Sequence, residues 1–132
     1  MSKIEDWRKT GIKSRERVKK CGEVFTPDWM VVKMCDMLEN ENDGAECWKG
    51  TVLEPACGTG NFLIEILKRK LSIGMTQEEA ASTLFGIDIM QDNVNESIER
   101  LSEIAPDARS IFEKNIVCGD FLHPKGIWFL ED

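Results

Sequence analysis

The stretch Val52-Leu53-Glu54-Pro55-Ala56-Cys57-Gly58-Thr59-Gly60-Asn61-Phe62-Leu63 decides the fold of this chain. A short apolar run at residues 51–53 predicts a buried strand, and Glu54 follows at its carboxyl end. The two glycines allow a tight turn, because glycine tolerates positive φ and lets a ligand approach the backbone closely. Apolar residues then recur at helical spacing, which predicts a helix leaving the turn. These residues are Leu63, Ile66, Leu67 and Leu71.

A strand, a glycine turn and a helix together form the opening unit of a nucleotide-binding type of α/β fold. In such folds ligands bind beyond the carboxyl ends of the strands. A glycine pair after a strand also occurs in plain turns, so a turn without a ligand is the competing interpretation. A phosphate loop is disfavoured because no Lys-Ser or Lys-Thr pair follows Gly60.

The composition is that of one globular domain. The chain has 132 residues, of which 42% are hydrophobic and 31% charged, and no apolar run is long enough to cross a bilayer. The amino terminus shows no signal-peptide core, so we expect a cytoplasmic protein without membrane contact.

The five cysteines are scattered, and we expect them to be reduced and mostly buried. We interpret Cys57 as a packing residue and not as a nucleophile.

Charge is distributed unevenly along the chain. Residues 1–20 contain eight Lys or Arg and three acidic residues, a net charge of +5, so residues 21–132 carry −12 of the total of −7. The acidic body argues against broad nonspecific binding to nucleic acid, whereas the basic segment permits local contact with phosphates. The equally weighted alternative is that Lys13 to Lys20 are only the solvated face of a helix.

A helix is expected before the glycine loop. Residues 28–38 carry apolar side chains on adjoining tracks, and Asp28 is the expected N-cap. Residues 39–50 are polar and acidic, which predicts a surface loop.

Strands and helices alternate after the glycine loop. Thr76 and Glu79 form a capping-box pattern that opens a short helix. Further strands are expected at residues 84–89 and 115–120, and residues 126–130 form either a fourth strand or merely an apolar end. Alternation of this kind is typical of parallel strands joined by helical crossovers. The sequence therefore predicts an α/β fold with a parallel sheet of three to four strands and N-terminal helices.

A carboxylate stands at the end of each expected strand: Glu54, Asp88 and Asp120. The carboxyl ends of parallel strands meet at one edge of the sheet, which is the expected ligand crevice. Three carboxylates together suit a divalent metal. Their β-α-β spacing is more typical of nucleotide-binding folds, in which the acid after the second strand accepts both hydroxyl protons of a ribose. Helix capping is the alternative role for each acid taken alone, and we expect no metal.

The string from Leu53 to Phe62 closely resembles the cofactor loop of S-adenosyl-L-methionine-dependent DNA methyltransferases that modify the exocyclic amine of adenine. The resemblance extends over residues 13–122. A Phe-Thr-Pro motif, in residues 22–27, precedes the glycine loop as in type I modification subunits and related adenine methyltransferases. The resemblance implies a partial Rossmann-like fold dependent on S-adenosylmethionine (SAM). Residues 1–21 would be a basic N-terminal helix or arm, and residues 22–132 the N-terminal part of the SAM-binding domain.

The same resemblance implies a role for residues of four motifs. The segment Phe25-Thr26-Pro27 would lie over the methionine portion of SAM, and Asp88 would hold the ribose hydroxyls. Ile89 would contact the adenine face, Asp120 would accept from the adenine amine, and Phe121 would cover the ring, a contact worth about 0.5–1.5 kcal/mol beyond area burial. The methionine and ribose pocket would be lined by Glu54, Ala56, Gly58 and Gly60.

The catalytic motif of these enzymes is absent from the sequence. The motif Asn/Asp-Pro-Pro-Tyr/Phe, which binds the flipped-out base, needs adjacent prolines, but none of the four prolines are adjacent and there is no tyrosine. We therefore expect no catalytic residue in this chain. The expected function is the SAM-binding part of a truncated, site-specific adenine-N6 DNA methyltransferase of a restriction-modification type, with transfer needing a second chain.

Two further expectations concern partners. DNA would be bound through the complete complex, and an exposed sheet edge favours a partner chain or self-association, because such edges tend to be covered. The alternative to a split enzyme is a catalytically inactive SAM-binding or docking module, a methylase remnant.

Overall fold

The computed structural model describes residues 25–122, which form a three-stranded parallel sheet with helices packed against it. The strands lie side by side in the order β1 (Val52–Glu54), β2 (Leu84–Asp88) and β3 (Ile116–Cys118). This arrangement confirms the predicted α/β, partial Rossmann-like fold. The expected basic arm and the apolar tail at residues 126–130 lie outside the described residues.

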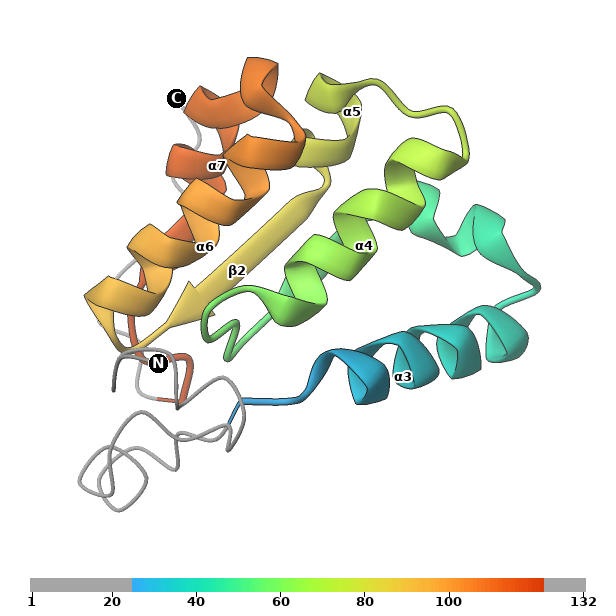
Figure 1. The fold of residues 1–132 in the computed structure, drawn as a ribbon, viewed down its shortest axis with the longest axis horizontal. Helices are drawn as coiled ribbons and strands as arrows, with labels where there is room; N and C mark the ends of the chain where they lie inside the picture. The colour runs from blue at the N-terminus through green and yellow to red at the C-terminus, as the bar shows by residue number, and fades with distance from the viewer. Residues whose placement is uncertain (1–24, 123–132) are drawn as a thin grey trace, which may run out of the picture.

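Helices connect the strands and cover the sheet (Figure 1). In Figure 1, α4 and α6 lie side by side across one face of the sheet, and α3 lies next to α4. The helices α5 and α7 pack against each other near the amino-terminal end of β2. In chain order the helical elements are α3 (Asp28–Glu41), the 3₁₀-helix η1 (Ala45–Lys49), α4 (Asn61–Ser72), α5 (Gln77–Ser82), α6 (Gln91–Ile104), the 3₁₀-helix η2 (Pro106–Ala108) and α7 (Arg109–Asn115).

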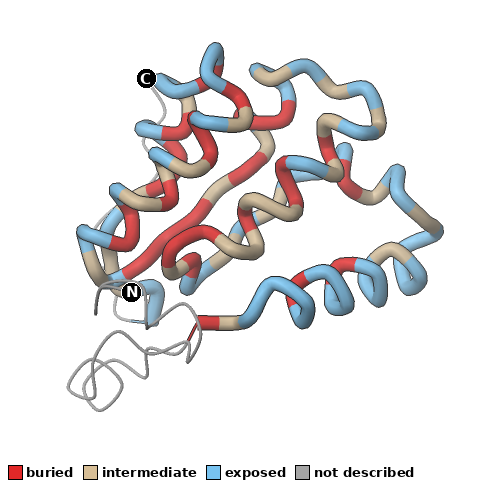
Figure 2. Tube along the Cα trace, viewed as in Figure 1, coloured by how far each residue is buried: buried red, intermediate tan, exposed pale blue. Residues whose placement is uncertain are grey.

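The hydrophobic core lies between the sheet and the inner sides of α4 and α6, where Figure 2 shows the buried residues concentrated. Leu63, Ile66 and Leu67 of α4 are all buried, as their helical spacing predicts. Gly86 in the middle of β2 permits this packing. A Cβ there would lie 2.9 Å from a methyl carbon of Leu63 and 3.2 Å from Cys57 Cβ. The sheet therefore approaches α4 closely because β2 has no side chain at that point.

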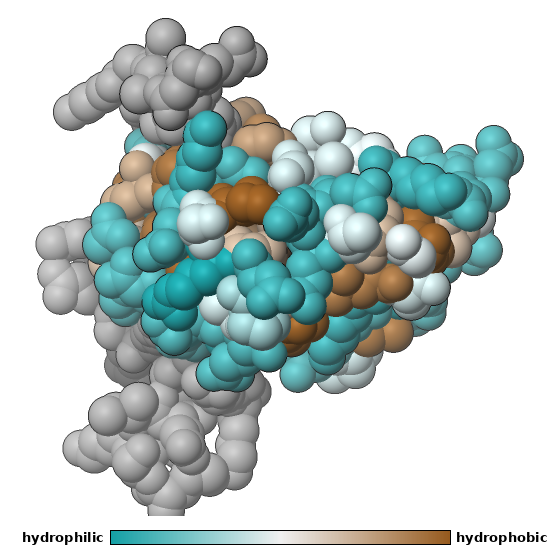
Figure 3. All heavy atoms as spheres, turned by 90° about the horizontal axis from the view of Figure 1, so that it is seen from above, coloured by the Kyte–Doolittle hydropathy of each residue, from teal (hydrophilic) through white to brown (hydrophobic). Residues whose placement is uncertain are grey.

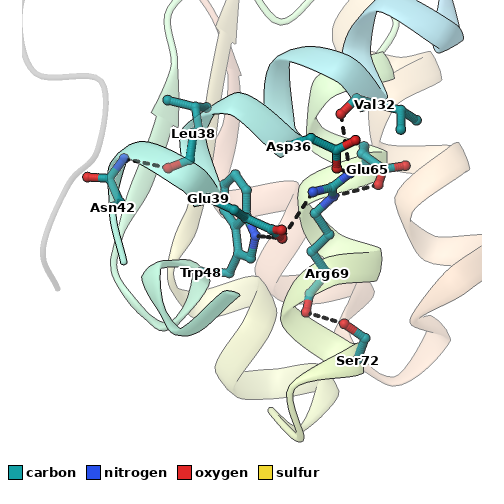
Figure 4. A network of polar contacts seen from close by, with 9 residues as sticks. All are labelled: Val32, Asp36, Leu38, Glu39, Asn42, Trp48, Glu65, Arg69 and Ser72. Carbon is teal, nitrogen blue, oxygen red and sulfur yellow. Dashed lines mark hydrogen bonds and ion pairs between the residues drawn. The ribbon is translucent and has the colours of Figure 1, made fainter. Parts of the chain in front are cut away.

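Arg69 fastens α3 to α4 (Figure 4). Its guanidinium lies 2.8 Å from a carboxylate oxygen of Asp36 and 3.0 Å from one of Glu39, both on α3. It also contacts Glu65 on its own helix at 2.7 Å. Trp48 joins the same group, because its indole N–H donates to Glu39 at 2.6 Å. We call Arg69, Asp36, Glu39, Glu65 and Trp48 the Arg69 cluster.

The surface is mostly hydrophilic on the face seen in Figure 3, with scattered hydrophobic areas. This fits the high content of charged residues. Within the described part of the chain, no helix has the length and apolar character needed to span a membrane.

Three local predictions were wrong or incomplete. Asp28 is not the N-cap of α3. Pro27 holds that position without a side-chain cap, and Asp28 is the first helical residue. The expected surface loop at residues 39–50 contains η1, and it buries Trp48, whose indole bonds Glu39 of α3 and lies against Arg69 of α4. The helix α7 was not predicted, since its seven residues are too short for a clear apolar period.

Other local predictions hold. The capping box of α5 is formed, with Glu79 N–H donating to Thr76 Oγ1 at 3.1 Å and Thr76 N–H donating to the Glu79 carboxylate at 3.0 Å. The expectation that the cysteines are mostly buried holds in part: Cys35 and Cys57 are buried, Cys47 is partly exposed, and Cys118 at the end of β3 is exposed. The cysteines of the described region are all free thiols.

Candidate binding site at the carboxyl edge of the sheet

The glycine loop, residues 55–60, runs from the end of β1 to the start of α4 along the carboxyl ends of the strands. Cys57 N–H donates to the carbonyl of Ile87 at 2.8 Å, which holds the loop against β2. Gly58 has φ +55° and Gly60 has φ +95°, both in the left-handed region. A Cβ on Gly60 would also lie 3.1 Å from Ser97 Oγ on α6. Both positions therefore need glycine for conformation and also for space, because an added Cβ would press on a neighbouring side chain at either one.

Asp88, the last residue of β2, is bonded to the glycine loop and to α6. One carboxylate oxygen accepts from Gly58 N–H at 3.0 Å. The other accepts from Met90 N–H at 3.0 Å and from the side-chain amide of Asn93 at 2.9 Å. The residue is only 8% exposed. Since a carboxylate offers about four acceptor sites, these three bonds leave it capacity for roughly one more donor.

The segment Phe25-Thr26-Pro27 lies against the same loop, although it comes from a part of the chain more than thirty residues earlier. The Phe25 ring is buried, and two of its carbons would be 2.9 Å from a Cβ on Gly58. The Thr26 carbonyl accepts from the side-chain amide of Asn61 at 2.7 Å. The structure thus brings together the two motifs that the sequence places before and after β1.

Glu54, at the end of β1, is half-buried and accepts from Ala56 N–H at 3.2 Å. Burial raises the pKa of the Glu54 carboxyl, and the hydrogen bond from Ala56 opposes that shift. Burial next to Asp88 raises the pKa of the Cys57 thiol to about 12. A thiol that stays protonated is a poor nucleophile, which fits a packing role for Cys57.

The ends of β2 and β3 carry the remaining predicted residues. Gly119 N–H donates to the Asp88 carbonyl at 2.9 Å and so joins the two strand ends. Asp120 accepts from Leu122 N–H at 3.0 Å. Ile89 is 47% exposed and Phe121 43% exposed, so this edge presents two large apolar side chains.

The predicted residues therefore fall into two groups. Phe25, Thr26, Gly58, Gly60 and Asp88 lie around the glycine loop, where Phe25 and Asp88 meet Gly58 directly. Thr26 is joined to the loop through Asn61, and Gly60 through Ser97. The others stand along the same edge with local contacts or exposed side chains, and they are Pro27, Glu54, Ala56, Ile89, Asp120 and Phe121.

Polar residues of α6 and α4 complete the loop, and sequence analysis missed them. Ser97 Oγ donates to the Gly58 carbonyl at 2.9 Å, and Arg100 donates to the Thr59 carbonyl and to Asn61 Oδ1, both at 2.8 Å. Asn93, Ser97 and Arg100 are spaced by four and three residues, which puts them on one helix face. Polar residues at that spacing beside the buried Leu101 were the available signal.

The three strand-end carboxylates do not form a metal site. Among residues 25–122, no group of three or more His, Cys, Asp or Glu side chains is placed to hold a metal ion. The oxygens of Asp88 face Gly58, Met90 and Asn93.

The fold and this edge define a class: a Rossmann-like α/β chain whose carboxyl edge is built from a glycine loop and a strand-end acid. Comparison with known proteins makes the assignment narrower. The sequence matches the N-6 DNA Methylase family over residues 13–100, more than half of the chain. The chain therefore belongs to the N-6 DNA methylase family, which confirms the resemblance seen in its motifs.

One curated relative is the Type II methyltransferase M.VspI of Vibrio sp. (strain 343). It is 33% identical over 101 residues, an alignment that covers 76% of this chain and 21% of M.VspI. The chain thus corresponds to about a fifth of that relative's length. No solved structure matches the chain.

Proposed function

We propose that this chain binds S-adenosyl-L-methionine at the carboxyl edge of its sheet. In this proposal it is the SAM-binding part of a site-specific adenine-N6 DNA methyltransferase of a restriction-modification type. The observation that carries the proposal is the meeting of Phe25, the glycine loop and Asp88 at one edge. These are the motifs that the family resemblance assigns to the cofactor.

The residues present suit the chemistry of SAM. The exposed side chains of Ile89 and Phe121 offer apolar surface for the adenine ring. The remaining acceptor capacity of Asp88 suits a ribose hydroxyl, and Glu54 and Asp120 add carboxylate oxygens along the edge. Phe25, Thr26 and Pro27, with the backbone of Ala56, Gly58 and Gly60, would hold the methionine portion. When bound, SAM would supply an electrophilic methyl group.

Calorimetric titration of the purified chain with SAM tests this proposal. Asp88→Ala is a poor control, because it would also release the Gly58 and Met90 amides and so deform the loop. Ile89→Ala is cleaner: it removes an exposed side chain and should weaken binding about 3- to 10-fold, the equivalent of one ring contact.

The matched control for Ile89→Ala is Leu38→Ala, which removes an equally exposed aliphatic side chain from α3. It should leave the affinity unchanged. A folded wild-type chain that takes up no SAM would refute the proposal.

We further propose that methyl transfer needs a second polypeptide carrying the Asn/Asp-Pro-Pro-Tyr/Phe motif, and that this polypeptide adds a strand to β1. Among the described residues β1 pairs on one side only, with β2. Leu53 in β1 is 42% exposed, and α3 exposes Met34 and Met37 at 44% and 53%. DNA would then be bound by the assembled complex, with the basic residues 1–21 contacting phosphates.

Co-expression with the coding sequence that follows it tests the second proposal. Recovery of a complex and of N6-methyladenine in the host DNA is the expected result. A chain that runs as a monomer at high concentration, captures no neighbouring product and yields no methylated adenine would argue against it. Self-association of the chain alone would favour a second copy at this edge.

A catalytically inactive SAM-binding or docking module is the second candidate. The observation favouring it is that this sequence contains no adjacent prolines and no tyrosine. SAM binding without any methylation, in the presence of the neighbouring gene product, would support this candidate. Methyl transfer to DNA by the purified chain would exclude it.

A further inference from the structure

Asn61 connects three segments of the chain at the start of α4. Its side-chain N–H donates to the Thr26 carbonyl at 2.7 Å, and its Oδ1 accepts from the Arg100 guanidinium at 2.8 Å. The same Arg100 nitrogen donates to the Thr59 carbonyl at 2.8 Å. A carboxamide can make both contacts at once because it has a donor and an acceptor. We call these contacts the Asn61 relay.

The relay acts where the Phe25-Thr26-Pro27 segment passes over the glycine loop. On one side of Thr26, the Phe25 ring fills the space above Gly58. On the other side, the Pro27 carbonyl begins α3 by accepting from Met30 and Val31 N–H at 3.0 and 3.1 Å. The Thr26 carbonyl therefore has little freedom once the Asn61 amide is oriented.

Arg100 in turn orients Asn61. An unoriented carboxamide can turn its oxygen toward Thr26, which would place two acceptors together. The guanidinium has only donors, so it requires the oxygen of Asn61 to face it and the nitrogen to face Thr26. Its second bond, to the Thr59 carbonyl, fixes Arg100 to the loop itself.

We propose that Asn61, oriented by Arg100, is a positioning residue that sets how the Phe25-Thr26-Pro27 segment closes over the methionine portion of SAM. This inference rests on the proposed function, because it concerns the same site. Asn61 acts through Thr26 and has no assigned contact with the cofactor. Its loss should weaken contacts to the amino-acid end of the ligand and spare those to the adenosine end.

The test compares two ligands, SAM and 5′-methylthioadenosine, which lacks the amino-acid portion. Asn61→Asp keeps an acceptor for Arg100 but cannot donate to Thr26. We expect it to raise the Kd for SAM about tenfold, as for one lost hydrogen bond, and the Kd for 5′-methylthioadenosine less than about twofold. Asn61→Ala removes both contacts and should show the same difference between the two ligands. It provides the test if Asn61→Asp does not fold.

Asn42→Ala is the matched control. Asn42 makes a similar bond from its amide to a carbonyl, that of Leu38 at 2.7 Å, at the far end of α3. The Asn42→Ala variant should change neither the affinity for SAM nor that for 5′-methylthioadenosine. Equal weakening of both ligands by the Asn61 variants, or no weakening, would overturn the inference while leaving the proposed function intact. A wild-type chain that binds neither ligand would instead overturn the proposed function, and the inference with it.

Discussion

The two ends of helix α4 are both held by polar contacts, but the contacts differ in kind. At the C-terminal end, Arg69 pairs with three carboxylates and Lys70 is fully buried. At the N-terminal end, Gly60 takes a left-handed conformation and Asn61 uses a neutral amide. Ion pairs and a buried ammonium thus anchor one end, whereas at the other end the Arg100 guanidinium bonds the neutral oxygens of Thr59 and Asn61.

Lys70 shows how the C-terminal end works. Its ammonium donates to the carbonyls of Trp48 and Gly50, the latter at 2.7 Å, and to Thr83 Oγ1 at 2.9 Å. All three ammonium protons therefore have partners. Burial lowers the pKa of Lys70. This end joins the C-terminal ends of η1 and α5 to α4, so it serves stability, while the opposite end shapes the glycine loop at the carboxyl edge of the sheet. Substitutions should separate the two roles.

Lys70→Met should have the largest effect, a loss of about 3 kcal/mol in the free energy of unfolding, because it leaves buried carbonyls without donors. Chemical denaturation measures this loss. Lys68→Met is the control, since Lys68 is exposed on the same helix. It should change stability by less than about 0.5 kcal/mol. Where Lys70→Met remains folded, its affinity for SAM should equal that of the wild type.

Gly58→Ala should disrupt the glycine loop at the N-terminal end of α4. An alanine at φ +55° costs about 1–2 kcal/mol in backbone energy, and its Cβ would press on the Phe25 ring at 2.9 Å. Gly74→Ala is the control, because Gly74 has φ +92° but nothing within 4 Å of its added Cβ. Both variants should lose similar backbone energy. Only Gly58→Ala should abolish SAM binding, and equal binding by the two would contradict the role of the loop.

Arg69→Lys sharpens the contrast at the C-terminal end. An ammonium cannot reproduce the planar fork that reaches Asp36, Glu39 and Glu65 together, so stability should fall by about 1 kcal/mol. Arg109→Lys is the control, since Arg109 and its partner Glu99 are both exposed and such pairs contribute little. Thermal unfolding at low and high salt measures the stability of both variants. Equal losses for Arg69→Lys and Arg109→Lys would contradict the role given to the Arg69 cluster.

Glu54→Gln should give the smallest effect, a gain. Because burial raises the folded-state pKa of Glu54 above its ordinary 4.5, the folded chain holds this proton more tightly than the unfolded chain. The tighter proton binding stabilises the folded chain below pH 4.5. This stabilisation is lost as the pH rises through 4.5 toward the folded-state pKa. Glutamine keeps the acceptor for Ala56, so the variant should be more stable at pH 7 by about 0.5 kcal/mol.

The gain from Glu54→Gln should shrink toward pH 4. Glu79→Gln should show the opposite trend with pH, because hydrogen bonds from Thr76 lower the pKa of Glu79. Denaturation curves across this pH range measure both. The same slope for the two variants would contradict the burial of Glu54.

The strands and the glycine loop could be predicted because their signals are local. Apolar runs mark β1, β2 and β3, and the glycines mark the turn. The contacts of Asn61 and Arg100 could not be predicted, since they depend on how α6 packs on α4, and a polar residue at a helical position gives no partner. The burial of Lys70 was hidden for the same reason. A lysine is normally assigned to the surface, and only the tertiary fold supplies its three acceptors.

The three strand-end acids also differ in their contacts. Glu54, Asp88 and Asp120 look equivalent in sequence, each following an apolar run. In the structure Asp88 is engaged by three donors from two segments, whereas Glu54 accepts one local bond and has a pKa raised by burial. The sequence pattern locates strand-end acids but does not distinguish an acid bonded to several segments from one with a single local bond.

The bonds of Asp88 have a consequence for the thermodynamics of recognition. They tie the glycine loop to β2 as part of folding, so the loop is preorganised and little chain entropy remains to be lost when a ligand arrives. Binding should therefore show a heat-capacity change that reflects only the apolar area buried between ligand and site, without the larger contribution of a segment that folds on binding.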